Sequence, residues 1–431
     1  MKRYSVRYLG GLGGVVRLPA SKSVSNRALI VGALAGGGVT PLNVSDCDDT
    51  RVMVRALAGS GDGCGCGSDV GSGVGLGGGE VVDIMGAGTA MRFLTAYFSV
   101  TEGERVLTGT ERMRHRPIGV LVDALRALGA DIEYVGEEGF PPLRVRGRRL
   151  KGGELELPGG VSSQYISALM MIAPALEKGL RLTLTGGVVS RPYIDLTMRV
   201  MRAYGGSVEW EEENVVRVNA GGYAAVPYMI ENDWSAASYW YEIVALAAST
   251  AGDAEVRLPG LFADSGQGDQ EVMRIFERLG VETRFEEDGV ALRGAGRRVE
   301  RLEMDFVKQP DLAQTVVVTC CLLGVKFRFT GLQSLRIKET DRIAALETEL
   351  RKWGYVVHDA EDSVMWWDGE MCDEASGAAI DTYDDHRMAM AFAPGSIVRG
   401  ETVVNEPGVV SKSYPGFWDD MRSMGFVIKE V

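Results

Sequence analysis

Residues 179–210, GLRLTLTGGVVSRPYIDLTMRVMRAYGGSVEW, contain one complete structural unit of this protein. Apolar and polar side chains alternate over residues 180–185, which predicts a half-buried strand. A glycine, a polar loop and an amphipathic helical segment follow, and that segment ends in a hydrophobe and Gly205. We expect Gly205 to take the left-handed conformation that ends a helix, with a further strand after it.

The same plan recurs about every seventy residues. The glycines that end the helices are Gly129, Gly205, Gly280, Gly354 and Gly425, at successive gaps of 76, 75, 74 and 71 residues. Gly59 lies 70 residues before Gly129 and marks a sixth, weaker copy. In one helix, Leu121, Leu125 and Leu128 form an apolar stripe. Glycines that recur by chance would not have a strand and a turn at the same distance before them in every copy, so we expect six βα-type units. The spacing does not show how these units are grouped into domains.

One segment breaks the pattern. Residues 59–79 are mostly glycine and of low complexity, and we expect a flexible surface excursion there. A phosphate-binding loop is the alternative, but no lysine followed by Ser or Thr stands in Walker A order at the start of a helix. We therefore predict a loop without that role.

The composition is that of an ordinary globular protein. Of 431 residues, 45% are hydrophobic and 24% are charged, and the length predicts two or three domains. The 46 Lys and Arg against 59 Asp and Glu give a net charge of −13, which argues against general nucleic-acid binding. No apolar run reaches the ~18 residues of a membrane span, and the start of the chain lacks the apolar core of a secretory signal. We expect a cytoplasmic protein that does not bind membranes.

The six cysteines and three histidines do not predict a metal site. Cys64 and Cys66 lie in the glycine-rich segment, and residues 320–321 are cysteines within an apolar run. No pair of cysteines has zinc-site spacing with a histidine nearby. We expect neither a metal nor another cofactor.

Basic residues gather at the expected starts of helices, where free backbone N–H groups and the helix dipole favour anions. Each of them taken alone is more simply a solvated helix start. Because they occupy equivalent positions in repeated units, we expect the units to converge, so that their positive ends line one cleft for substrates with several negative charges. These residues are Lys22, Arg27, Arg112, Arg114, Arg116, Arg191, Lys338, Arg342, His386, Arg387 and Lys412.

Hydroxyl and amide side chains cluster in a similar way. Ser162, Ser163 and Gln164 precede an apolar helical segment, and Ser190 and Tyr193 flank a turn in the next repeat. A single serine at such a position is an ordinary N-cap. Two serines and a glutamine together can also donate several hydrogen bonds to a phosphate.

Asp311 and Glu339 are the candidates for acid–base chemistry. Asp311 precedes a nearly uncharged helix, so the alternative role for it is an N-cap. Glu339 neighbours Lys338, so the alternative for it is a salt-bridged surface residue. A cationic cleft would keep both carboxyl groups ionised unless a dianionic substrate lies beside one of them.

Several motifs resemble one known family. They are PASKSVSNRALI, GAGTAMRFLTA, TGTERMRHRPIGVLVDALRALGA, SSQYISALMMIAPAL, SRPYIDLT, KETDRIAALETELRKWG, DDHRMAMAF and VVSKSYPGFW. Together, in order from Lys22 to Lys412, they resemble the 5-enolpyruvylshikimate-3-phosphate (EPSP) synthases, also called 3-phosphoshikimate 1-carboxyvinyltransferases. The resemblance implies a two-domain α/β enolpyruvyl transferase-like fold of six βαβαββ units, three in each domain, around a central cleft that closes on substrate. We expect one domain at 1–20 plus 232–431 and the other at 21–231.

The resemblance implies transfer of the enolpyruvyl group of phosphoenolpyruvate to the 5-hydroxyl of shikimate 3-phosphate, with release of phosphate, by a monomer. It assigns the hydroxyl proton to Asp311 and proton transfer at the methylene carbon to Glu339 and Lys22. The residues that match contacts of shikimate 3-phosphate are Lys22, Ser23, Arg27, Ser162, Ser163, Gln164, Ser190, Tyr193, Asp311, Ser334 and Lys338. Those that match contacts of phosphoenolpyruvate are Lys22, Gly88, Thr89, Arg116, Gln164, Arg342, His386, Arg387 and Lys412.

The chain departs from the family pattern at a few positions. Gly86 stands where an asparagine is usual, Phe93 replaces a proline, and Ser334 replaces an asparagine. The segment around Trp234 also differs from the common glycine-containing hinge. From Gly86 and Phe93 we expect an altered sensitivity to glyphosate-like competitors, which a comparison of inhibition constants with the Gly86→Asn variant tests.

Two other functions remain as alternatives. A sister family transfers enolpyruvate to UDP-N-acetylglucosamine, but it has Lys-Asn in place of Lys22-Ser23 and usually a reactive cysteine in the loop that here spans residues 112–116. A non-catalytic anion-binding scaffold is the other alternative. It does not explain why Asp311, Glu339 and Lys22 are all present.

Overall fold

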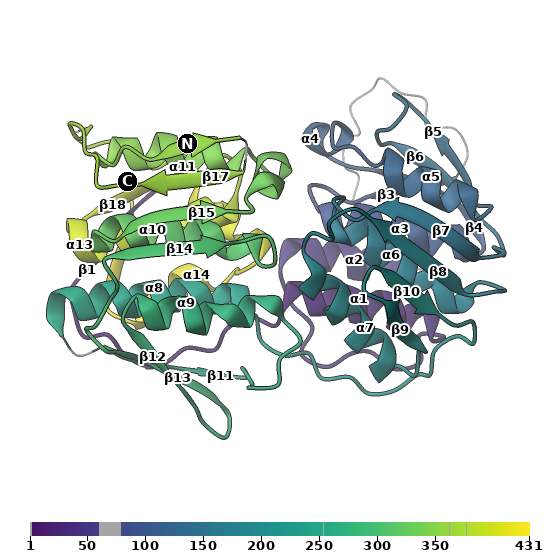
Figure 1. Cartoon of the computed structure of the whole chain (residues 1–431), viewed down its shortest axis with the longest axis horizontal. Coiled ribbons are helices and arrows are strands. Elements are labelled where there is room, and N and C mark those ends of the chain that lie inside the picture. The colour runs from purple at the N-terminus through teal and green to yellow at the C-terminus, as the bar shows by residue number, and fades with distance from the viewer. Residues whose placement is uncertain (1, 60–78, 253, 362, 376) are drawn as a thin grey trace. The chain divides into compact units, whose positions relative to one another are not determined.

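The computed structural model describes residues 2–59, 79–252, 254–361, 363–375 and 377–431. They form two compact units (Figure 1). The discontinuous unit combines the chain up to Ser21 with Glu231–Val431, and the inserted unit spans Lys22–Ile230. Residues 60–78, for which we expect a surface excursion, lie outside the described residues.

The inserted unit contains two four-stranded sheets of the same topology. Their strands are β3 (Glu80–Asp83), β4 (Gly103–Thr108), β5 (Asp131–Tyr134), β6 (Leu143–Gly147), β7 (Gly153–Pro158), β8 (Leu180–Thr185), β9 (Val208–Glu212) and β10 (Val215–Val218). The strand orders are β3-β4-β6-β5 and β7-β8-β10-β9. In each sheet the first pair is parallel, with a helix between its strands, and the other pairs are antiparallel.

The discontinuous unit repeats this topology twice. Its eight strands in these sheets are β2 (Gly13–Val15), β11 (Glu255–Pro259), β12 (Val281–Phe285), β13 (Gly289–Gly294), β14 (Arg301–Asp305), β15 (Lys326–Thr330), β16 (His358–Ala360) and β17 (Val364–Trp367). The orders are β12-β13-β11-β2 and β14-β15-β17-β16, and the parallel pairs are β2–β11 and β14–β15. Because β2 precedes the inserted unit and β11 follows it, one parallel pair spans the whole insertion.

A fifth sheet joins the two ends of the chain. Strand β1 (Arg3–Tyr8) lies antiparallel between β18 (Thr402–Asn405) and β19 (Phe426–Glu430). In the other four sheets a parallel strand precedes the strand that corresponds to β18. Here a single parallel bridge between Ile380 and Val404 of β18 takes that place. The last repeat is therefore completed by the first strand of the sequence. In the region of the sixth, weaker copy, the described residues contain one parallel bridge, between Leu42 and Met229.

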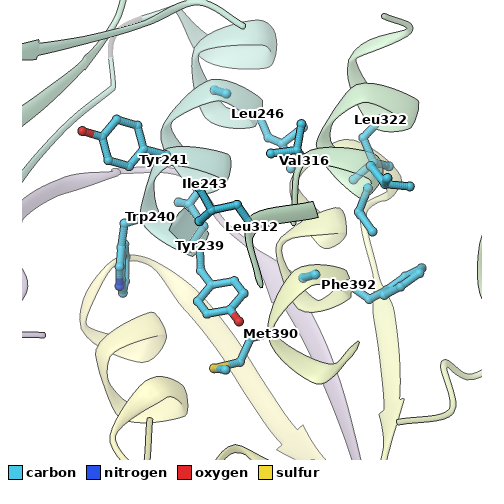
Figure 2. Close-up of a cluster of buried hydrophobic side chains, with 14 of the residues drawn as sticks. Tyr239, Trp240, Tyr241, Ile243, Leu246, Leu312, Val316, Leu322, Met390 and Phe392 are labelled. Atoms are coloured by element: carbon cyan, nitrogen blue, oxygen red, sulfur yellow. The ribbon is translucent and has the colours of Figure 1, made fainter. Parts of the chain in front are cut away.

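The helices fall into a buried set and an amphipathic set. The buried helices are α1 (Lys22–Leu34), α3 (Gly88–Val100) and α6 (Ser163–Ile172) in the inserted unit, and α8 (Trp234–Ala251), α10 (Ala313–Leu323) and α12 (His386–Phe392) in the discontinuous unit. Figure 2 shows how side chains of α8, α10 and α12, among them Trp240, Val316 and Phe392, form one hydrophobic cluster. The remaining helices are α2 (Asp48–Ala58), α4 (Glu111–Arg114), α5 (Gly119–Ala127), α7 (Arg191–Ala203), α9 (Val272–Arg278), α11 (Arg342–Lys352), α13 (Ser396–Arg399) and α14 (Phe417–Ser423).

The repeat predicted from sequence is confirmed. All six helix-ending glycines have positive φ, from 69° at Gly59 to 99° at Gly129. The stripe Leu121, Leu125 and Leu128 is buried, and β8 alternates between buried and partly exposed residues over most of its length. None of the helices within the described ranges is long and apolar enough to cross a membrane.

Candidate active site

Most residues expected to bind substrates lie at or beside the starts of helices, and mainly of the buried ones. In the inserted unit these positions are Lys22 and Ser23 on α1, Gly88 and Thr89 on α3, and Ser163 and Gln164 on α6. In the discontinuous unit they are Asp311 in the short helix η3 (Pro310–Leu312) before α10, Arg342 on α11, and His386 and Arg387 on α12. Backbone N–H groups free of helix bonds point outward at such ends, so side chains placed there add to an existing preference for anions.

Arg342 is the centre of a charged cluster in the discontinuous unit. Its side chain is 2% exposed and donates to three carboxylates: Asp385 at 2.7 Å, Asp311 at 3.1 Å and Glu339 at 2.8 Å. Burial opposes the charge, but the attraction of the three carboxylates, Asp385 first, outweighs burial and raises the pKa of Arg342. Arg342 therefore stays charged and fixes the positions of both acids expected to transfer protons.

Asp311 has two further cations beside it. Arg387 Nη2 lies 3.0 Å from one carboxylate oxygen, and Lys338 Nζ lies 3.4 Å from the other. Arg387 Nη1 also donates to the backbone carbonyl of Asp311 at 3.0 Å. The N-cap alternative for Asp311 is wrong, because the N-cap residue of α10 is Leu312 and makes no side-chain cap bond. The Asp311 side chain instead points toward the basic residues and remains about 20% exposed, which a ligand can use.

Glu339 and Ser334 lie on the segment that leads into α11. Glu339 does form a salt bridge, as its alternative role requires, but with the buried Arg342. Its side chain keeps 24% exposure, so it combines a fixed position with access to a reactant. Ser334 lies in the short helix η4 (Gln333–Ile337), and within the part of the chain that the structure describes its buried hydroxyl has no hydrogen-bond partner.

The start of α12 and the segment after β18 contribute further charges. Asp385 caps α12 by accepting the backbone N–H of Arg387 at 2.8 Å, while it also holds Arg342. His386 is 2% exposed, with Nδ1 3.9 Å from Asp385. Lys412 lies 2.6 Å from Asp384. Asp384 therefore holds Lys412, and Asp385 holds Arg342 and the backbone at the start of α12.

In the inserted unit, Arg27 is buried, and its hydrogen bonds to described residues involve no acid. Its guanidinium donates to the hydroxyls of Thr197 at 2.7 Å and Ser167 at 3.2 Å, and to the carbonyls of Ser23 and Tyr193 at 2.9 and 3.4 Å. Burial lowers the pKa of Arg27 to about 10, so the side chain remains charged at neutral pH. A buried cation bonded mainly to neutral oxygens leaves a positive field for an anionic ligand.

Lys22, on the first turn of α1, pairs with Asp49 at 3.1 Å. Both side chains are less than one-fifth exposed, at 18% and 15%. Asp49 belongs to the first turn of α2, so two helix starts meet at this pair. Asp49 holds the ammonium of Lys22 in place.

Two arginines pack over the start of α3. Arg92 donates to the carbonyl of Gly88 at 2.8 Å. A Cβ on Gly88 would lie 2.5 Å from Arg92 Nη1 and 2.6 Å from Arg116 Nη1, so only glycine permits this close approach. Gln164 on α6 donates to the Thr89 hydroxyl at 2.9 Å. The first turns of α3 and α6 are thus tied together, with Arg116 beside them.

The hydroxyl residues show both of the roles considered for them. Ser162 is the N-cap of α6 and accepts the N–H of Gln164 at 3.4 Å, so the ordinary cap role applies to it. Ser163 is 8% exposed at the first position of that helix. Ser190, at φ 58°, precedes α7, and its carbonyl accepts the N–H of Tyr193 at 3.1 Å. Left-handed backbone is costly for a serine, which is consistent with a functional constraint.

Some of the basic residues expected in the cleft are used elsewhere. Arg191 stacks on Trp210, with 3.8 Å from guanidinium carbon to ring centroid, and donates to the Glu213 carbonyl at 2.7 Å. Arg112 and Arg114 are exposed on α4. The expectation that every basic helix start lines one site is therefore wrong for Arg191, whose charge faces the edge of its own sheet.

Sequence reasoning missed three functional candidates: Asp49, Arg92 and Asp385. Arg92 and Asp385 lie inside quoted motifs, and a charged residue within an apolar helical run is a signal for Arg92. Asp49 gave no local signal. Within the described ranges, no group of three or more His, Cys, Asp or Glu is placed to hold a metal ion.

Comparisons with known proteins agree on one family. The family model for EPSP synthase (3-phosphoshikimate 1-carboxyvinyltransferase) matches residues 6–421. A protein of Bacteroides fragilis named 3-phosphoshikimate 1-carboxyvinyltransferase is 54% identical, covering 99% of each chain, and one of Aliivibrio salmonicida with the same name is 37% identical, covering 98% of this chain and all of that one. A solved EPSP synthase structure from Acinetobacter baumannii matches over the full length of both chains with a TM-score of 0.78 at 23% identity, which supports the fold.

Proposed function

This chain belongs to the EPSP synthase family, and we propose that it transfers the enolpyruvyl group of phosphoenolpyruvate to the 5-hydroxyl of shikimate 3-phosphate, releasing phosphate. The observation that carries the proposal is the Arg342 cluster. A buried guanidinium there fixes two carboxylates, Asp311 and Glu339, each still partly accessible. Anion binding alone does not require two positioned acids.

The reaction requires two proton movements. The 5-hydroxyl oxygen bonds to C2 of phosphoenolpyruvate and loses its proton, while the methylene carbon gains one, giving a tetrahedral ketal. The ketal then loses a methyl proton and its C–O bond to phosphate breaks, which restores the double bond. We assign acceptance of the hydroxyl proton to Asp311, and proton exchange at the methylene carbon to Glu339 and Lys22.

The remaining charges suit two anionic substrates. We assign shikimate 3-phosphate to the hydroxyl-rich residues around Arg27, together with Lys338 and Ser334. We assign phosphoenolpyruvate to Arg116, Gln164 and the Gly88-Thr89 turn in the inserted unit, and to Arg342, His386, Arg387 and Lys412 in the discontinuous unit. A hydrogen bond to a charged group contributes about 1.5–3 kcal/mol, so several such contacts hold both anions without a metal.

The test is phosphate release by the purified chain supplied with both substrates. We expect phosphate release with shikimate 3-phosphate, a vinyl product signal in the proton NMR spectrum, and a monomer by gel filtration. UDP-N-acetylglucosamine in place of shikimate 3-phosphate is the control acceptor and should give no release. Release with that sugar nucleotide alone, or with neither acceptor, refutes the proposal. We further propose that the protein acts in the cytoplasm.

A further inference from the structure

Asp269 is a buried acid that the mechanism above does not use. It lies in the short helix η2 (Gly268–Glu271), is 4% exposed, and accepts a hydrogen bond from the Ser235 hydroxyl in the first turn of α8. Burying a carboxyl group costs free energy. Its presence at this position therefore calls for a reason.

Capping of α8 does not supply that reason. Asp233 accepts the N–H groups of residues 235 and 236 at 2.7 and 3.2 Å. Gln267 accepts the N–H of Trp234 at 3.2 Å. The N–H groups of the first turn have acceptors without Asp269, so the helix start does not require it.

Asp269 and the proposed base, Asp311, lie on two short helices that pack against the same helix. Helix α8 packs against both η2, which carries Asp269, and η3, which carries Asp311. The start of α8 is also joined to α10, since the hydroxyls of Ser238 and Thr315 lie 3.3 Å apart. The two acids are thus held against the same helix, within the discontinuous unit.

The charges around Asp269 come from three elements: Asp233 at the start of α8, Asp311 in η3 and Arg387 on α12. Burial, and after it the charge of Asp311, raise the pKa of Asp269 to about 7, although Ser235 and Arg387 act in the opposite direction. Asp269 therefore changes charge near neutral pH.

A carboxylate surrounded by cations is a reluctant proton acceptor, because the cations favour its ionised form. Three cations lie within 3.4 Å of Asp311. A second negative charge nearby offsets them. On the basis of the proposed function, we propose that Asp269 is a positioning residue for the proton acceptance by Asp311: its ionised carboxylate increases the proton affinity of Asp311, and its protonation removes that effect.

The experiment is the pH dependence of kcat from pH 5.5 to 9 for the full chain, with phosphate release as the readout. For the parent protein we expect kcat to rise about tenfold as pH increases through a midpoint near 7. This is the effect expected when the pKa of the base, Asp311, rises by about one unit. Asp269→Asn should lack that rise, so it should match the parent within about threefold at pH 6 and fall about tenfold below it at pH 8.5. Ser235→Ala should keep the rise but move its midpoint to higher pH, since a hydrogen bond that favours the ionised form is lost.

A purely structural role predicts something different. Asp269→Asn would then lower kcat by the same factor at every pH, and that outcome overturns the proposal. If Asp269→Asn does not fold, Ser235→Ala decides, and an unmoved midpoint overturns the proposal. An inactive parent protein refutes the proposed function instead, and the midpoint of Asp269 is then measured by carbon-13 NMR of its carboxyl, where a value below about 5 contradicts the inference.

Discussion

Replacing Arg342 by glutamine tests whether the charged cluster holds the discontinuous unit together. The substitution keeps much of the side-chain volume and removes the charge, leaving Asp311, Glu339 and Asp385 without their shared partner. Asp385 is fully buried, so it has no access to water in compensation. Removing one partner of a buried ion pair costs about 3–5 kcal/mol. We expect the free energy of unfolding of the discontinuous unit to fall by about that amount.

Tryptophan fluorescence during urea unfolding measures this unit almost alone. Of the 7 tryptophans, every one except Trp210 lies in the discontinuous unit. The matched control is Arg301→Gln, because Arg301 also pairs with two acids, Glu303 and Asp368, but its side chain is 39% exposed. Exposed pairs contribute at most about 1 kcal/mol, so this control should unfold close to the parent protein.

A second substitution separates lost charge from lost packing. Arg342→Gln combined with Asp385→Asn relieves the uncompensated buried carboxylate, and should recover about 1–3 kcal/mol of the loss. A loss below about 1 kcal/mol for Arg342→Gln, or no recovery in the double variant, refutes the view that buried charge compensation stabilises this unit.

Three further predictions follow from single residues. Asp311→Asn should lower kcat at least ~100-fold in the phosphate-release assay, which is the usual scale for a lost general base. Near-normal turnover contradicts that role. Gly88→Ala should push the two arginines away from the start of α3 and raise KM for phosphoenolpyruvate about tenfold, with little change in kcat; an unchanged KM contradicts the packing argument. Burial raises the pKa of Glu242 well above its ordinary value of 4.5, so this carboxyl group is buried at the lowest cost when it is neutral. Its contribution to the free energy of unfolding is therefore fully present at low pH and is lost as pH rises. Glu242→Gln should therefore unfold at a higher urea concentration than the parent protein at pH 8, with a smaller difference at pH 5. If the difference between variant and parent is the same at both pH values, Glu242 is not neutral in the folded protein.

The repeat was predictable because its signals are local. A glycine with positive φ ends each of the repeated helices, as at Gly129 and Gly425. The identity of this one residue is enough to predict the end of the helix. Alternation along β8 and the leucine stripe on α5 depend on neighbours within a few residues. Pairing of β1 with strands some 400 residues later was not visible in the spacing, because register across such separations depends on the assembled sheet.

The candidate site was predictable only in part, for the same physical reason. Basic residues at helix starts are visible because caps and termini have sequence signals. The partners of Arg342 are not, since Asp385 lies 43 residues away and Asp311 lies 31 away. Asp269 meets Ser235 across 34 residues, and neither residue stands out where it occurs. Charge compensation within a core is a property of the folded chain.

The six buried helices show how one repeated position acquires different chemistry. In the inserted unit their starts carry basic, hydroxyl or amide groups, such as Lys22 and Gln164, which add to the anion preference of a helix start. In the discontinuous unit, α8 and α10 pack against each other and begin beside acids instead, Asp269 and Asp311. The helix start and the surrounding cations oppose protonation of Asp311. Burial acts in the opposite direction on Asp269 and raises its pKa. Placing the two acids against one helix restores proton affinity through mutual repulsion, and this explains why the pair occurs where the repeat otherwise favours bound anions.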